Sequence, residues 1–144
     1  MVDMDPAIRP TYAFNKTRQT VIASELSIAD THWTRLKGLI GVGAKRFLPG
    51  HGLWIVPCHG VHTMAMAFTI DIVYLNEHKT VVHVEENVKP WRVTPIRMDA
   101  ATVIEVPNRT VGRTFTEVGD DIEIRSFDDE VIPDSAHQVD QVSQ

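Results

Sequence analysis

Five short runs rich in β-branched and aromatic residues, separated by polar links, constrain the fold of this chain most. They span residues 19–29, 68–75, 80–87, 101–106 and 120–127. Such side chains pack well on a pleated sheet, so each run predicts a strand. Side chains alternate in character along residues 19–29, which predicts one strand there. The polar link "NEHK" (76–79) has the length of a hairpin turn, so the two runs that flank it should pair.

One segment, residues 31–40, predicts a short helix. Asp30 can cap its N-terminus, and Trp33, Leu36 and Ile40 then share one face at helical spacing. The glycines that follow should end the helix quickly. Many short strands with one small helix, and no alternation of strands with long helices, predict a mainly β fold, either a β-sandwich or a small barrel.

The length of 144 residues and the hydrophobic content of 43% fit one domain with a sizeable core. Residues 1–10 carry two prolines and little apolar pattern, and residues 128–144 are polar and acidic. We therefore expect a single β domain over residues 11–127 between two flexible tails.

The net charge of −5, with Lys45 and Arg46 as the only adjacent basic pair, argues against a nucleic-acid partner. No apolar run approaches the ~20 residues of a membrane helix, so no membrane partner is expected. One cysteine cannot form an intramolecular disulfide, and the first ten residues lack an apolar signal core. Together these features predict a cytoplasmic location.

The only cysteine begins a cluster of reactive side chains, Cys58, His59 and His62. Zinc accepts thiolate and imidazole ligands, so this spacing raises the possibility of a metal site. In a strand, however, Cys58 and His62 share a face while His59 points away. The spacing also matches no familiar zinc pattern. Cys58 and His62 are therefore weak metal candidates, and no cofactor is predicted.

A second interpretation makes Cys58 a nucleophile, with His62 or His59 as its base and Asp71 or Glu105 as the carboxylate that orients it. A cysteine needs a positive neighbour or a helix N-terminus to lower its pKa, and the histidines supply only part of this. No predicted helix begins near Cys58, and no thiol-enzyme signature surrounds it. A hydrolase-type enzyme is thus the alternative rather than the first expectation.

The structural interpretation is that this segment fills a core. Free cysteine is among the most buried residue types. Met64, Met66 and Phe68 recur at a spacing of two, which predicts a core-facing strand. Asp71 interrupts the apolar run "TIDIVYL", and a carboxylate there must be paired, hydrogen-bonded or exposed. It either accepts backbone N–H groups at a strand crossing or belongs to a site.

Glu105 in "VIEVP" is a second carboxylate among apolar neighbours, which Arg92 or Arg97 could pair with. Trp91 and Arg92 lie in the proline-flanked stretch "VKPWRV", where an exposed tryptophan would indicate a recognition surface. The catalytic candidates are Cys58, His62, Asp71 and Glu105. The candidate ligand-binding residues are His59, Trp91, Arg92 and Arg97.

An ordered series of motifs resembles a known bacterial and archaeal family. The motifs are RLKGL (35–39), GLWIVPC (52–58), IDIVYL (70–75), VIEVP (103–107) and GD (119–120). They cover about residues 19–126 and resemble the domain of unknown function 192 family, also called uncharacterised protein family 0127. The resemblance implies a jelly-roll-like β-sandwich or small barrel with one short helix. It implies no reaction, because the activity of that family is not established.

The chain also departs from the family pattern. His62 and Thr63 stand where many members carry W-M-K-N-T, which is similar to a His-Thr branch of the family. Ala67 and Thr69 stand where that branch often has arginine and proline, so any role of that arginine is missing here. Arg109 replaces a usual glycine, and we expect the turn there to differ.

We therefore expect a small β domain that binds a small molecule or a protein partner in a cleft near residues 57–71. The two alternatives are a hydrolase that uses Cys58 and His62 with Asp71 or Glu105, and a structural or accessory domain with no ligand.

Overall fold

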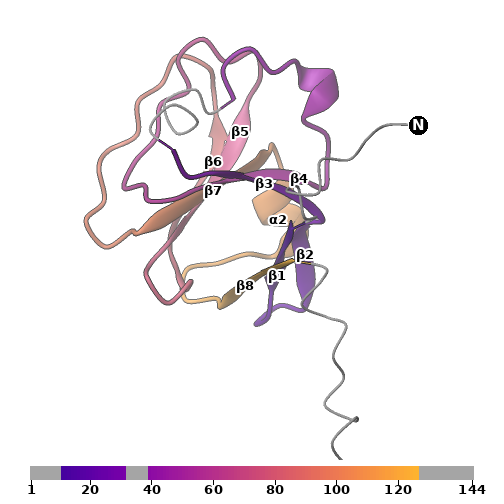
Figure 1. The fold of residues 1–144 in the computed structure, drawn as a ribbon, viewed down its shortest axis with the longest axis vertical. Helices are drawn as coiled ribbons and strands as arrows, with labels where there is room; N and C mark the ends of the chain where they lie inside the picture. The colour runs from indigo at the N-terminus through magenta and orange to yellow at the C-terminus, as the bar shows by residue number, and fades with distance from the viewer. Residues whose placement is uncertain (1–10, 32–38, 127–144) are drawn as a thin grey trace, which may run out of the picture.

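The computed structural model describes residues 11–31 and 39–126, and this part of the chain is mainly β, as predicted (Figure 1). Its strands are β1 (Thr11–Asn15), β2 (Thr20–Ala23), β3 (Glu25–Ala29), β4 (His51–Ile55), β5 (Ile70–Leu75), β6 (Val81–Val88), β7 (Thr102–Pro107) and β8 (Ile122–Ser126). A 3-10 turn, η1 (Ala44–Arg46), and a short helix, α2 (Thr110–Thr114), complete these elements. The helix predicted at 31–40 lies mostly outside the described residues.

The strands form two sheets, with no closed barrel among the described residues. One has the order β2-β1-β8, and the other has the order β3-β4-β7-β5-β6. Neighbouring strands run antiparallel except β3 and β4, which run parallel. The predicted hairpin is confirmed, since β5 and β6 pair across residues 76–79. Asn76 closes its turn by accepting the N–H groups of His78 and Thr80.

The single strand predicted over residues 19–29 is wrong, because the chain changes sheets at Ser24. Ile22 and Ala23 are both buried, whereas Ser24 and Glu25 are both exposed, so the alternation breaks at this corner. The corner packs directly on β4 at Gly52. A Cβ atom on Gly52 would lie 2.9 Å from the Cβ atom of Ala23, so only glycine allows this close approach.

Each face of the five-stranded sheet carries its own hydrophobic core. The inter-sheet core lies between the two sheets and includes Ala13, Ile22, Ala23, Leu26, Val73, Leu75, Val81, Ile104, Val106, Val111 and Ile122. The loop core lies on the other face and includes Ala29, Leu39, Phe47, Leu53, Ile55, Val61, Met66, Ile70, Ile72, Tyr74, Val88, Ala100 and Val103. Because β5 is buried on both faces, its alternating side chains enter the two cores in turn.

The strand face predicted at residues 64–68 is also wrong. Ala65 has a φ of 59°, in the left-handed region, and the chain turns there instead of continuing as a strand. Met66 is buried in the loop core, whereas Met64 is 45% exposed. No helix in the described ranges has the length and apolar character of a membrane span.

Candidate functional site

The residues that the sequence singled out gather mainly on two segments that run side by side, 57–63 and 91–101. Thr94 joins them through three hydrogen bonds to Val61: its N–H and its hydroxyl donate to the Val61 carbonyl at 2.9 and 3.0 Å, and its Oγ1 accepts the Val61 N–H at 2.9 Å. The Cys58 N–H donates to the carbonyl of Ala101 at 2.9 Å. Backbone pairing therefore fixes the loop-core edge on which six candidates lie, namely Cys58, His59, His62, Trp91, Arg92 and Arg97.

Cys58 is half-buried and packs against the loop core. Its thiol donates to the carbonyl of Gly60 at 3.1 Å. Tyr74 belongs to the same core, and its burial is the main cause that raises the pKa of its hydroxyl to about 12. The Cys58 thiol thus bonds to a carbonyl acceptor and packs in a core that also holds a neutral phenol.

The two histidines near Cys58 have different surroundings. His59 is exposed, and its Nδ1–H donates to the carbonyl of Ala100 at 2.6 Å, because a carbonyl can only accept. The Nδ1 atom of His62 is buried and has no hydrogen-bond partner within residues 11–31 and 39–126. Its main chain forms a bridge with Val93. The His62 Nδ1 atom is therefore not bonded to the thiol.

Asp71 is fully buried and faces the inter-sheet core, opposite to the face on which Cys58 packs. Its Oδ1 accepts the N–H of Asn87 at 3.0 Å, and its Oδ2 accepts the N–H of Val111 at 3.0 Å. The carboxylate thus fastens the end of β6 and the start of α2 to β5. The structure does not bring Asp71 together with Cys58 and His62.

Glu105 lies in β7 between Leu53 on β4 and Ile72 on β5, and it is 2% exposed. Burial raises its pKa to about 8, so the carboxyl group is protonated at neutral pH. Its Oε2 atom has no hydrogen-bond partner among the described residues. The expected pairing with an arginine does not form, since Arg97 pairs instead with Asp99 at 3.2 Å. In the described ranges, no three His, Cys, Asp or Glu side chains gather as a metal site would need.

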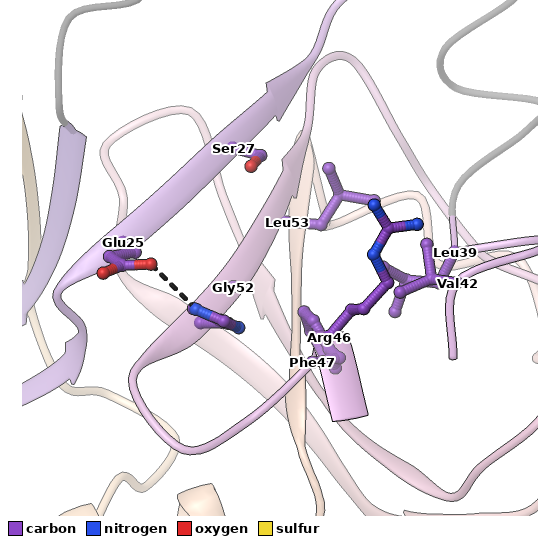
Figure 2. A pocket seen from close by; sticks show the side chains of 9 residues that line it. Glu25, Ser27, Leu39, Val42, Arg46, Phe47, Gly52 and Leu53 are labelled. Atoms are coloured by element: carbon purple, nitrogen blue, oxygen red, sulfur yellow. Dashed lines mark ion pairs between the residues drawn. The ribbon is translucent and has the colours of Figure 1, made fainter. Parts of the chain in front are cut away.

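A cavity of about 350 Å³ opens on the loop-core face, where β3 and β4 meet residues 39–47. Figure 2 shows the guanidinium of Arg46 reaching across it toward Leu39 and Leu53. Together with Phe47 these two leucines make an apolar floor. Arg46 is exposed and forms no ion pair with any residue that the structure describes.

The opposite wall of the cavity carries Glu25 and His51, whose side chains lie within hydrogen-bond distance of each other (Figure 2). The His51 Nδ1 accepts the N–H of Leu48 at 3.1 Å, so the ring proton sits on Nε2 and points to Glu25 at 2.8 Å. Phe47 stacks on Phe68, with ring centroids 5.5 Å apart, which stiffens the floor.

None of the eight candidates predicted from the sequence lines this cavity. Its walls come from three separate parts of the chain, so no local spacing could reveal them. The one available signal was the adjacent basic pair of Lys45 and Arg46 directly before an apolar residue.

The fold and the site define a small two-sheet β domain with an open, arginine-bearing cavity. The chain belongs to the DUF192 family (uncharacterized ACR), whose model matches residues 13–124, and the family predicted from the motifs is thereby confirmed. It is 27% identical to a UPF0127 protein of Thermococcus sibiricus over 76% of this chain and 71% of that one. It is also 29% identical to a UPF0127 protein of Pyrococcus furiosus, over 76% and 94% of the two chains.

Solved structures share the fold at low sequence identity. A protein of unknown function from Novosphingobium aromaticivorans is 18% identical, with a TM-score of 0.66 over 79% of this chain and 83% of that one. A protein from Sinorhizobium meliloti with a solved crystal structure is also 18% identical in sequence, with a TM-score of 0.68 over 83% of this chain and 97% of that one. These similarities concern the fold alone.

Proposed function

We propose that this chain is a small-molecule-binding domain that holds a carboxylate with an apolar body in the cavity between β3, β4 and residues 39–47. The observation that carries the proposal is the guanidinium of Arg46, which reaches over an apolar floor without an ion-pair partner among the described residues. A planar guanidinium recognises a carboxylate through two parallel hydrogen bonds.

The size and lining of the cavity support a ligand of this kind. Small-molecule sites are commonly clefts of about 300–1,000 Å³ with mostly apolar walls and few polar groups. The volume of about 350 Å³ suits a compact ligand. Leu39, Phe47 and Leu53 would cover its apolar body, while Arg46 would hold its charge.

This site borders the segment on which the sequence placed the cleft. Phe68, near the end of residues 57–71, stacks on Phe47 and so supports the cavity floor. Within the described ranges the Cys58 segment itself supports binding less well. The ring nitrogen of His59 already donates to a carbonyl, and Asp71 faces the other core.

A panel of small carboxylates tests the proposal: hexanoate, phenylacetate and indole-3-acetate, each beside its neutral primary amide. We expect saturable binding of at least one carboxylate, followed by methyl and aromatic NMR shifts at Leu39, Phe47 and Leu53. The matching amide should bind more weakly, because it lacks the charge that Arg46 would pair with.

The variant Arg46→Met removes this charge and keeps the length of the side chain. It should lower carboxylate affinity by about tenfold or more, since a charge-assisted pair is lost. The matched control is Lys45→Met, which removes the neighbouring charge outside the cavity lining and should leave the affinity unchanged. Equal weakening by both variants, or equal binding of acid and amide, would refute the proposal.

A further inference from the structure

We propose a second functional surface, the connection between β6 and β7, as the face that docks this domain on an anionic lipid bilayer. This surface, residues 89–98, is named here the basic apolar loop. The connection lies at the left edge of the molecule in Figure 1, beside residues 57–63. It does not line the cavity that holds Arg46.

Large apolar side chains of the basic apolar loop stand in solvent. Trp91 is 63% exposed, Val93 72%, Ile96 75% and Met98 81%. Single exposed apolar residues are ordinary on a protein surface, but four within one short connection make a patch. Such a patch marks a surface that is covered by something when the protein works.

The backbone beneath these side chains is held in place. Trp91 donates its N–H to the carbonyl of Thr63, and Arg92 donates its N–H to the Thr63 Oγ1, both at 2.8 Å. Further along, the N–H of Arg97 donates to the carbonyl of His59 at 2.8 Å. The apolar tips are therefore exposed on an ordered backbone, and little conformational entropy is lost when they are buried.

The charge of the basic apolar loop is opposite to that of the whole chain. Lys89, Arg92 and Arg97 fall within it, and the one acidic residue of the β6–β7 connection, Asp99, pairs with Arg97 at 3.2 Å. Lys89 and Arg92 are exposed and form no ion pair with any residue that the structure describes. The chain as a whole carries a net charge of −5. A local cluster of cations on an acidic molecule orients that molecule toward an anionic surface, and each cation near such a bilayer favours binding.

The combination of exposed apolar side chains and cations in the basic apolar loop fits a lipid bilayer better than a protein partner. Tryptophan and basic side chains favour the headgroup region, while aliphatic and methionine tips favour the acyl boundary below it. A bilayer accepts such tips without a matching cavity, whereas a protein would need one. The sequence-based expectation of no membrane partner considered only spanning segments, and peripheral docking requires none.

Vesicle flotation with the full chain tests this proposal. The probes are vesicles of phosphatidylcholine alone and vesicles with about one-third phosphatidylglycerol, the anionic content on which the electrostatic part depends. We expect the chain to float with the anionic vesicles, to stay behind with the neutral ones, and to be released as salt screens the charges. In a Trp33→Phe, Trp54→Phe background, the Trp91 emission should shift to shorter wavelength on binding.

Matched charge variants identify the surface. Arg92→Gln should weaken partitioning by about fivefold, the effect of one cation near an anionic bilayer. The control is Arg113→Gln, an exposed arginine on α2 with the same change in net charge. Trp91→Ser should also weaken binding. Because Trp91 and Arg92 are exposed, neither variant should change the unfolding temperature.

Three outcomes would overturn the proposal: no flotation with anionic vesicles, equal loss with Arg92→Gln and Arg113→Gln, or capture of a soluble protein by the loop without vesicle binding. The proposal is independent of the cavity. The Arg46→Met chain should therefore float with the anionic vesicles as the unchanged chain does. If none of the carboxylates binds, the flotation test still decides whether the loop docks on a bilayer.

Discussion

Glu105 is the residue whose environment departs most from its ordinary chemistry. It lies between Leu53 and Ile72, and no residue that the structure describes forms a hydrogen bond with its Oε2 atom. Burial raises its pKa to about 8 from an ordinary value of 4.5. Because the folded state binds the proton more tightly than the unfolded state, this residue favours folding most at low pH. That contribution is complete below about pH 4.5 and is lost as the pH rises through about 8.

The variant Glu105→Gln should therefore remove the pH dependence that Glu105 gives to the free energy of unfolding. Each pKa unit corresponds to about 1.4 kcal/mol, so between pH 5 and pH 8 the unchanged chain should lose about 3 kcal/mol more stability than the variant. Urea unfolding at the two pH values measures the difference. Parallel pH profiles for the two chains would show that Glu105 does not titrate in this way.

For individual residues, the sequence predicted which side chains are buried better than it predicted their hydrogen-bond partners. A carboxylate within "TIDIVYL" has to be paired, hydrogen-bonded or exposed, and Asp71 accepts two backbone N–H groups, as one of the two interpretations of the sequence predicts. Its second donor, Val111, lies 40 residues further along the chain, so only the folded structure identifies it. The basic pair that includes Arg46 could not locate the cavity, because Leu53 and Glu25 approach Arg46 only after β3 and β4 pair.

At the scale of elements, the corner between β2 and β3 decides how the two sheets join. The chain leaves the small sheet at Ala23 and enters the large one at Glu25. The corner rests on Gly52 of β4, where an added Cβ would lie 3.0 Å from the Leu26 Cδ1 atom as well as near Ala23. The junction between the two sheets thus depends on the absence of a side chain at Gly52.

Gly52→Ala should destabilise the domain by about 1–3 kcal/mol, because the added methyl group overfills a closed contact. Gly43→Ala provides the matched control, since a Cβ there meets nothing within 4 Å and the φ of −80° suits alanine. Thermal unfolding of both variants gives the comparison. A Gly52→Ala chain as stable as the Gly43→Ala chain would mean that β4 can move away from the corner.

Elements defined by tertiary contacts were the ones that the sequence did not reveal. Helix α2 has only five residues, includes Gly112, and is flanked by Arg109 and Phe115 in left-handed conformations. Local propensity would not favour a helix there, but Asp71 accepts the N–H of Val111 and holds its first turn. In contrast, β5 to β7 have strong local patterns and were predicted within a few residues.

At the scale of the whole molecule, the two hydrophobic cores are not independent. Strand β5 sends Ile72 into the loop core and Val73 into the inter-sheet core, and β7 likewise contributes to both. Loss of either core would expose one face of the same central strands. The domain should therefore unfold as one cooperative unit.

This cooperativity can be measured with one truncation in each core. Ile72→Ala and Val73→Ala should each lower the free energy of unfolding, by about 2–5 kcal/mol for the isoleucine. In both variants, far-UV circular dichroism and the fluorescence of Trp54 should give the same transition midpoint. Trp54 packs against the inter-sheet core, so it should be followed in a background where Trp33 and Trp91 are phenylalanine. Separate midpoints in the Ile72→Ala chain would indicate that the loop core opens alone.

The pairing of β1 with β8 has a consequence for the order of events during synthesis. The residues of the five-stranded sheet have all been translated once Pro107 is added, so that sheet can assemble early. β1 must wait for its partner, because Thr11 pairs with Ser126 across almost the whole described chain. Until β8 leaves the ribosome, Ala13 and Ile22 lack the strand that completes their sheet, and the nascent chain carries a half-covered apolar face.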